Sequence, residues 1–225
     1  MSSIRSAGSS TLSITNLHRQ PVKSRTVNEI EQYEAALNEN PDDACRQYDL
    51  ALCYLRHERN RQALELLDGM LRTHKRDPRA FYARAVVYLS MNNYSKAGCD
   101  FLRTIALDPD FLDAYKHLGF IQLTLGKEEA ARKTLKTALE KDPSDAGLYC
   151  VLGDVYLDTG EPEKAKAAFE KAFELDPQSA EPHCKLAMYY VSKGDMKGLK
   201  KEYDLLRDLD PSMAAQIETL FFQPL

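Results

Sequence analysis

The chain has 225 residues, of which 30 are basic and 34 acidic, giving a formal net charge of −4. So small a charge selects no partner, and no basic stripe carries interleaved aromatic residues, so we expect no nucleic-acid binding. No apolar run approaches the ~20 residues that span a bilayer, so no membrane span is expected. The five cysteines and five histidines show neither disulfide nor metal-ligand spacing, which predicts free thiols in a reducing compartment, no metal site and no cofactor.

Residues 1–25 are rich in serine and contain four basic residues but no acidic one, so the remainder carries 26 basic and 34 acidic residues, or −8. The simplest interpretation is a flexible tail on a cytoplasmic protein. An organelle transit peptide has a similar composition and would place the protein in an organelle matrix. A third interpretation is a docking arm, because Leu12 and Ile14 alternate with polar residues. A fourth is autoinhibition, in which the basic tail occupies the protein's own binding groove.

A half-repeat helix is expected over residues 26–43. Thr26 and Glu29 have the S/T-x-x-E spacing of a capping box, so this helix should begin at Thr26. Pro41 should end it. The apolar face would be formed by Val27, Ile30, Tyr33 and Leu37. Such a helix would cap the repeats that follow.

Residues 146–179 have the pattern of a two-helix hairpin. One helical face is formed by Tyr149, Leu152, Gly153 and Tyr156, and a second by Ala165, Phe169 and Ala172. Gly160 suits the left-handed conformation that ends a helix, and Pro162 suits the first turn of the next. Asp176-Pro177 should end the second helix, because proline has no N–H to donate.

This hairpin recurs with a period of 34 residues. The units are 44–77, 78–111, 112–145, 146–179 and 180–213. The dipeptide Asp-Pro also recurs every 34 residues, from Asp108 to Asp210. The eighth position is always small: Ala51, Ala85, Gly119, Gly153 and Ala187. A larger side chain there would hold the two helices of a hairpin apart, so Gly153→Leu should destabilise the fourth hairpin.

These aromatic, small and proline positions resemble the tetratricopeptide repeat (TPR) family. The resemblance covers residues 44–213 and implies an all-α, right-handed α-α superhelical solenoid of five tandem hairpins over residues 44–211. Six positions depart from the family pattern: Gln47, Lys75, Arg84, Gln122, His183 and Leu199. The chain contains no Gly-rich phosphate loop, nucleophile elbow or H-E-x-x-H motif, so we expect no enzyme activity and no catalytic residues.

Residues 212–225 should form a C-terminal capping helix and an apolar tip. Ser212 is expected to cap this helix. Its apolar face would hold Met213, Ile217, Leu220 and Phe221. Phe222 points away from that face and, with Pro224 and Leu225, would form a tip that folds back or supports weak self-association.

The candidate binding residues lie at positions two, five and nine of the first helix in each hairpin. In the family, this stripe lines a concave groove that holds partner peptides. The predicted partner-binding residues are Tyr48, Leu52, Arg79, Tyr82, Val86, Lys116, Phe120, Cys150, Asp154 and Met188. Aromatic and methionine side chains would supply most of the affinity, and Lys116 and Asp154 would set register and orientation.

The resemblance therefore implies a non-catalytic scaffold or adaptor that binds a peptide or helix of a partner protein. A dedicated chaperone or assembly factor for one client and a regulatory subunit of an enzyme complex are the alternatives. A family subclass binds chaperone C-termini through a Lys/Asn/Arg clamp. The comparable positions here hold Tyr48, Leu52, Ala83, Lys116 and Phe120, so that clamp is expected to be absent.

Overall fold

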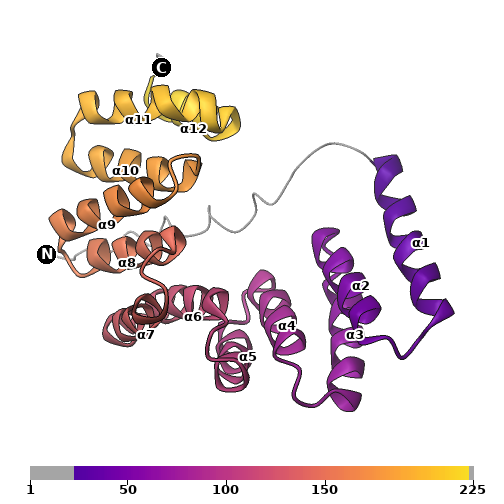
Figure 1. Cartoon of the computed structure of the whole chain (residues 1–225). Coiled ribbons are helices and arrows are strands. Elements are labelled where there is room, and N and C mark those ends of the chain that lie inside the picture. Colours follow the sequence, from indigo (N-terminus) through magenta and orange to yellow (C-terminus); the bar gives the residue numbers. More distant parts are fainter. Residues whose placement is uncertain (1–22, 223–225) are drawn as a thin grey trace, which may run out of the picture. The chain divides into compact units, whose positions relative to one another are not determined.

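The computed structural model describes the backbone of residues 23–222 and the side chains of residues 29–222. Within this range the chain forms twelve α-helices and no strand (Figure 1). They are α1 (Lys23–Glu39), α2 (Ala44–Arg56), α3 (Asn60–Thr73), α4 (Pro78–Ser90), α5 (Tyr94–Leu107), α6 (Leu112–Thr124), α7 (Glu128–Lys141), α8 (Ala146–Asp158), α9 (Pro162–Leu175), α10 (Ala180–Lys193), α11 (Met196–Leu209) and α12 (Pro211–Phe221). None of them is both long and apolar enough to cross a bilayer. The tail, transit-peptide and docking-arm interpretations of residues 1–25 concern a segment that lies almost wholly outside the described residues, as do Pro224 and Leu225.

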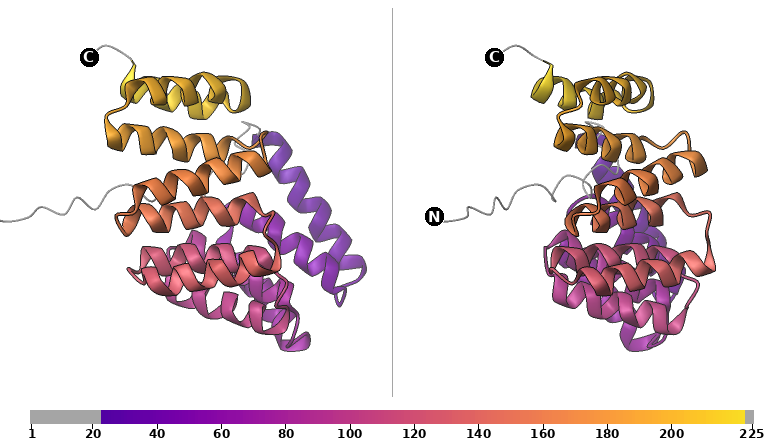
Figure 2. Two further views of the ribbon diagram at one scale, coloured as in Figure 1. Left: turned by 60° about the vertical axis from the view of Figure 1, so that its left-hand side comes forward. Right: turned by 90° about the vertical axis from the view of Figure 1, so that its left-hand side faces the viewer.

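The chain forms two compact bodies, which we describe separately. The N-terminal body runs to Ala114 and holds α1 to α5, and the C-terminal body starts at Tyr115 and holds most of α6 and all of α7 to α12. In each body, consecutive helices pack as hairpins, such as α4 with α5 and α8 with α9. Figure 2 shows α8 to α11 lying in successive layers, and α8 also contacts α10. First helices of neighbouring hairpins therefore lie side by side.

The first helices begin 34 residues apart, at Ala44, Pro78, Leu112, Ala146 and Ala180. A polar side chain immediately before the helix accepts hydrogen bonds from its first turn in four of the five hairpins: Asp43, Asp77, Asp145 and Ser179. Each such cap stabilises a helix by about 1 kcal/mol. The corresponding residue before α6 is Phe111, which has no side-chain acceptor to offer.

The turn inside each hairpin contains one residue in the left-handed conformation. The five positions are spaced by 34 residues: Glu58 (φ 59°), Asn92 (φ 57°), Gly126 (φ 66°), Gly160 (φ 73°) and Gly194 (φ 67°). The left-handed Gly160 and the first-turn Pro162 confirm the predicted break between α8 and α9. Glycine occupies this backbone region without strain, whereas glutamate does not.

The small residue at position eight lets the two helices of a hairpin approach closely. A Cβ placed on Gly153 would lie 2.2 Å from Cε1 of Phe169, and a Cβ on Gly119 would lie 2.8 Å from Cδ2 of Leu135. Both partners are fully buried. The missing side chain thus makes room for the largest apolar group of the facing helix, as the repeat pattern predicts.

The helix α1 caps the N-terminal body, but it begins at Lys23 and not at Thr26. The predicted helix start was therefore wrong by three residues. Glu29, expected to close a capping box, instead directs its carboxylate to Arg56 and His57 on α2 and the adjoining turn. Ile30 is buried, and Tyr33 and Leu37 pack beside it, as their spacing predicts.

Polar contacts also attach α1 to α2. The Tyr54 hydroxyl donates a hydrogen bond of 2.6 Å to Glu34. Burial, and then this hydrogen bond, raises the pKa of Tyr54 to about 12. The guanidinium of Arg46 bonds the carbonyl of Ala36 and the carboxylate of Glu39. The half-repeat is thus held by an apolar face with hydrogen bonds at its margin.

At the other end, α12 begins at Pro211, and Asp210 rather than Ser212 is its N-cap. The Asp210 carboxylate accepts from the N–H groups of Ser212 and Met213, while Pro211 supplies a preformed first-turn φ. Ile217 is buried, but Leu220 is 71% exposed and so was wrongly placed on the apolar face. Phe222 folds back, with its ring centroid 5.1 Å from that of Tyr203.

Candidate functional site

The N-terminal body presents five predicted binding residues on its first helices. We call this set, Tyr48 and Leu52 of α2 with Arg79, Tyr82 and Val86 of α4, the N-terminal face. These two helices contact each other directly. All four apolar or aromatic members are half-buried, and Arg79 is exposed.

An arginine lies over an aromatic ring at this face. The guanidinium carbon of Arg79 is 5.7 Å from the ring centroid of Tyr48, a cation–π contact. Asp77 holds the arginine in place, with 3.1 Å between Arg79 Nη2 and Asp77 Oδ2. Burial raises the pKa of Tyr48, and the charge of Arg79 opposes that rise. Tyr48 is therefore a neutral ring covered on one side by a positioned cation.

The second aromatic residue of the face, Tyr82, packs into the body. Its ring centroid is 4.6 Å from that of Phe111 and 5.7 Å from that of Phe101. Burial raises the pKa of Tyr82, and the charge of Asp113 raises it further. Tyr82 is thus a rigid aromatic group that shows only part of its surface.

The C-terminal body presents the other five predicted residues, which we call the C-terminal face: Lys116 and Phe120 of α6, Cys150 and Asp154 of α8, and Met188 of α10. Phe120 is half-buried and Met188 is 45% exposed. Cys150 is only 1% exposed, and burial raises the pKa of its thiol. Its thiol is a packing group, reachable by a partner only if its neighbours move.

Charged side chains on this face pair with one another between hairpins. Lys116 Nζ lies 3.2 Å from Asp145 Oδ2, and Lys185 Nζ lies 2.6 Å from Asp154 Oδ2. Lys185 was not among the predicted residues, because position six was not included in the stripe. The sequence does contain a signal for Lys185. Position six follows position five on the first helix, so its side chain can reach the first helix of the preceding hairpin.

Acidic groups outnumber basic ones around Lys185. Burial raises the pKa of Asp154, and the ammonium of Lys185 opposes that rise. Glu181, on the first turn of α10, behaves in the same way: burial raises its pKa and Lys185 opposes this. Three carboxylates (Asp145, Asp154, Glu181) therefore face two ammonium groups (Lys116, Lys185) on this body. Such a surface favours an additional cation.

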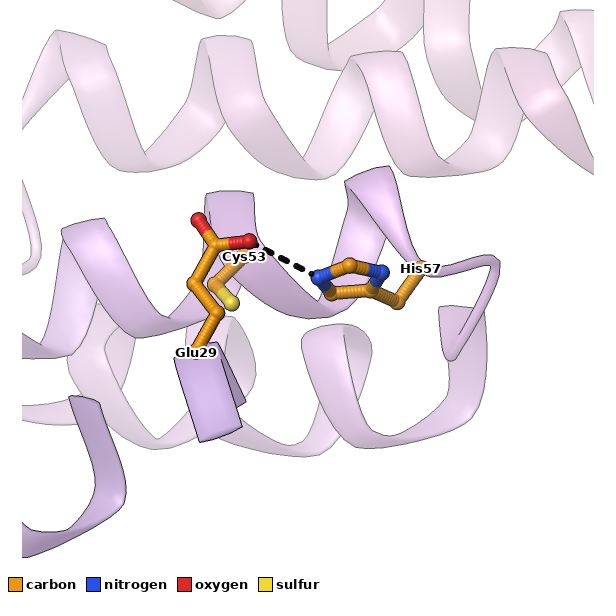
Figure 3. Close-up of side chains that lie close together, drawn as sticks. All are labelled: Glu29, Cys53 and His57. Carbon is orange, nitrogen blue, oxygen red and sulfur yellow. Dashed lines mark hydrogen bonds and ion pairs between the residues drawn. The ribbon is translucent and has the colours of Figure 1, made fainter. Parts of the chain in front are cut away.

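A different cluster lies between α1 and the end of α2, outside both faces. Glu29, Cys53 and His57 bring one oxygen, one sulfur and one nitrogen atom within 4.8 Å of one another (Figure 3). His57 Nε2 is 3.1 Å from Glu29 Oε2, and Cys53 is fully buried. The sequence was expected to show no metal-ligand spacing. Only the fold brings Glu29, which is distant along the chain, to Cys53 and His57, which are four residues apart.

This stack of paired helices with small-residue contacts defines a helical-repeat protein. Sequence profiles of the tetratricopeptide repeat match residues 30–87, 82–146 and 146–179. The chain belongs to the TPR family, and its fold is the predicted all-α solenoid of tandem hairpins.

One curated relative is similar to part of this chain. The chain is 24% identical over 129 residues to Hsp70-Hsp90 organizing protein 2 of Arabidopsis thaliana, a match that covers 56% of this chain and 23% of that protein. The chain thus spans about a quarter of that relative's length.

Two solved structures show the same fold. One is a thermophilic TPR protein from Thermus thermophilus, with a TM-score of 0.72, 24% identity, and coverage of 80% of this chain and all of that one. The other is YrrB, a TPR protein with an unusual peptide-binding site, with a TM-score of 0.56, 21% identity, and coverage of 84% and 99%.

Proposed function

We propose that this protein is a non-catalytic interaction scaffold that binds a peptide or helical segment of a partner protein on its first-helix faces. TPR proteins as a family bind other proteins, and YrrB is described as having a peptide-binding site. The observation that carries the proposal for this chain is the arginine-covered aromatic group of the N-terminal face. The absence of enzyme activity stays a prediction, in keeping with a family whose members are generally interaction modules.

The N-terminal face supplies anchoring surface. The rings of Tyr48 and Tyr82 are held by packing, so little side-chain entropy is lost when a partner contacts them. The exposed guanidinium of Arg79 supplies donors for a backbone carbonyl or carboxylate next to an apolar side chain. Aromatic and arginine side chains of this kind provide most of the affinity in protein interfaces.

The C-terminal face would select a partner segment by its charge. We expect the partner segment to place one basic side chain near Asp154 and Glu181, because both carboxylates are partly desolvated and Lys185 is the nearest cation to each. Lys116 and Asp154 were expected to orient the partner. Each already has a counter-ion within the protein, so the partner must displace Asp145 from Lys116 or Lys185 from Asp154. Met188, which is exposed, would contact an apolar neighbour of that basic residue.

The relationship to a protein that organizes Hsp70 and Hsp90 does not by itself favour a chaperone C-terminus as the ligand. At the clamp positions of the N-terminal body, Tyr48 and Leu52 are half-buried and Ala83 is fully buried. Lys116 in the C-terminal body is engaged with Asp145. We therefore propose an apolar segment with a basic residue rather than an acidic C-terminal tail.

A peptide-display selection against the purified chain tests this proposal. Selected peptides should share apolar side chains and a basic residue, and they should lose at least tenfold in affinity on Arg79→Glu or Met188→Glu, about 1.4 kcal/mol or more. Both residues are exposed, so these changes leave the folded core intact. The matched controls are Leu102→Glu and Leu205→Glu, exposed apolar residues on the second helices α5 and α11 of the same two bodies.

Two results would contradict the proposal. Selected peptides that lose affinity with Leu102→Glu or Leu205→Glu, but not with the face variants, would move recognition to the second helices. Peptides that all end in an acidic C-terminus and depend on their free carboxylate would instead support a chaperone-tail adaptor. Equal helical circular dichroism of all variants is the control for folding.

A further inference from the structure

We propose that Glu29, Cys53 and His57 form a zinc-binding site that fastens the capping helix α1 to the first repeat. Figure 3 shows the three side chains converging from α1, from α2 and from the residue that follows α2. Their ligand atoms all lie within 4.8 Å of one another. This site is independent of the proposed binding faces.

The donor set matches zinc. Zinc is bound in proteins by cysteine sulfur at about 2.3 Å and by histidine nitrogen and carboxylate oxygen at about 2.0–2.2 Å, usually in a tetrahedron. Ligand atoms on such a tetrahedron are about 3.3–3.7 Å apart. Glu29 Oε2 and His57 Nε2 are already 3.1 Å apart, and the three ligand atoms, all within 4.8 Å of one another, would have to draw together around the ion. One thiolate among the ligands favours zinc over magnesium or calcium, which prefer oxygen alone.

The surrounding chain holds the ligands in place. Cys53 and His57 are four residues apart, so one helical turn sets their relative position. Cys53 is fully buried and His57 largely so, which keeps bulk water from competing on that side. Arg56 contacts Oε1 of Glu29, leaving Oε2 directed toward His57. Arg56 is thus an outer hydrogen-bond partner of the kind that orients a ligating carboxylate.

Binding is a ligand exchange whose charges balance. The Cys53 thiol releases its proton to solvent and coordinates as a thiolate, His57 coordinates through neutral Nε2, and Glu29 coordinates through Oε2. Any proton that His57 shares with Glu29 is also released. Water fills the fourth position of the tetrahedron. The bound ion would replace the Glu29–His57 contact by one coordination bond to α1 and two to α2 and the residue that follows it.

Cobalt titration tests the site directly, because a cobalt ion bound to a thiolate gives a charge-transfer absorption band. The purified full chain should bind one cobalt ion per chain with this band, and zinc should displace it. Cys53→Ser should abolish the band, and His57→Gln and Glu29→Gln should each weaken cobalt binding at least tenfold. Cys99→Ser, which removes an exposed thiol, is the matched control and should leave the titration unchanged.

Hydrogen exchange provides a second, local measurement. Zinc should slow amide exchange in α1 of the wild-type chain, and EDTA should reverse the effect, while α12 should be unaffected. His57→Gln removes a partly exposed ligand, so it tests the site without a cavity in the core. The proposal is overturned if the wild-type chain gives no thiolate band, if the band persists in Cys53→Ser, or if it is lost in Cys99→Ser.

Discussion

At the scale of single residues, Gly153 determines how closely two helices pack. Its Cα faces the ring of Phe169, and an added Cβ would lie 2.2 Å from that ring. In contrast, a Cβ on Gly69 would meet only the end of the Arg72 side chain, at 3.7 Å. Replacing each of the two glycines by leucine and comparing the stabilities therefore separates the cost of overpacking from the effect of helix propensity.

We expect Gly153→Leu to lower the free energy of unfolding by about 1–3 kcal/mol, because the added side chain would overlap the fully buried ring of Phe169. Gly69→Leu should leave stability unchanged or raise it by up to about 0.8 kcal/mol, since leucine is the better helix former. Urea denaturation followed by circular dichroism measures both. Equal stabilities of the two variants would contradict the packing at position eight.

Glu161 is a residue whose ionisation depends on specific neighbouring side chains. Its carboxylate accepts hydrogen bonds from Lys164, from Arg132 of the preceding hairpin at 2.7 Å and from Thr159 at 3.1 Å. These contacts, first that of Lys164 and then that of Arg132, lower the pKa of Glu161 to about 2. The carboxylate thereby connects α7 to the turn before α9.

Because the folded-state pKa of Glu161 lies below its unfolded value, the stability that its charge contributes is fully present above about pH 4.5 and is lost as pH falls toward about 2. An NMR titration of the Glu161 carboxyl carbon should therefore show a midpoint near 2. Lys164→Met should raise that midpoint, whereas Lys171→Met, which removes the partner of Glu174, should not. An unshifted midpoint in the wild-type chain would refute the contact with Lys164.

Several residue-scale contacts could not be predicted from the sequence. Arg84 departs from the repeat pattern, yet its largely buried guanidinium pairs with Asp100, at 2.7 Å, and with Asp68, at 2.6 Å. Lys185 similarly pairs with Asp154 in another hairpin. An ion pair between helices depends on how far two long side chains extend across the contact between those helices. A 34-residue sequence period does not specify this. The apolar and small positions were predictable because each repeats the same local contact.

At the scale of helices and turns, the periodic pattern predicted where first helices begin and where α8 and α9 separate. It failed at the two ends of the chain. The helix α1 starts at Lys23, and Glu29, which was expected to close a capping box, pairs with Arg56 of α2 instead. The helix α12 starts at Pro211 because Asp210 caps it. End helices have a neighbour on one side only, so local caps and single ion pairs decide their bounds.

The turn of the first hairpin contains a strained residue. Glu58 has a φ of 59°, where glycine occupies the equivalent turn of the last three hairpins. The left-handed conformation costs an L-residue about 1–2 kcal/mol, against about 0.5–1 kcal/mol of chain entropy for glycine. We therefore expect Glu58→Gly to raise the free energy of unfolding by about 0.5–1 kcal/mol.

Asn92→Gly is the matched control for Glu58→Gly, because asparagine tolerates the left-handed conformation and has a φ of 57°. Its effect on stability should be smaller. Thermal unfolding of the two variants beside the wild-type chain measures this difference. A destabilised Glu58→Gly variant would show that Glu58 makes a contact worth more than its backbone strain.

At the scale of the whole molecule, the ten predicted binding residues fall on two bodies, five on each. The stripe could be identified from the sequence because positions two, five and nine of a first helix are not needed for packing between the two helices of its hairpin. It did not distinguish exposed from buried members, so Cys150 was included although it is only 1% exposed. Exposure depends on neighbouring hairpins, and one sequence does not specify their side-chain packing.

The proposed scaffold function has two chemically different faces. The N-terminal face offers aromatic rings and an arginine, and the C-terminal face offers a methionine and an excess of carboxylates. A segment bound at the N-terminal face would need apolar residues, and one bound at the C-terminal face would need a basic residue. A client-specific assembly factor and an enzyme regulatory subunit differ in the partner that carries this segment, and the identity of the captured protein separates them.

Site-specific photocrosslinking in lysate of the source cells tests the central claim most directly. A photoreactive amino acid is placed at Val86 or Met188, on the two faces, and at Leu102 or Leu205, on second helices of the same bodies. We predict that one partner, identified by mass spectrometry, is crosslinked from Val86 or Met188 and not from Leu102 or Leu205. Crosslinking of that partner from the second helices alone would contradict recognition by the first-helix faces.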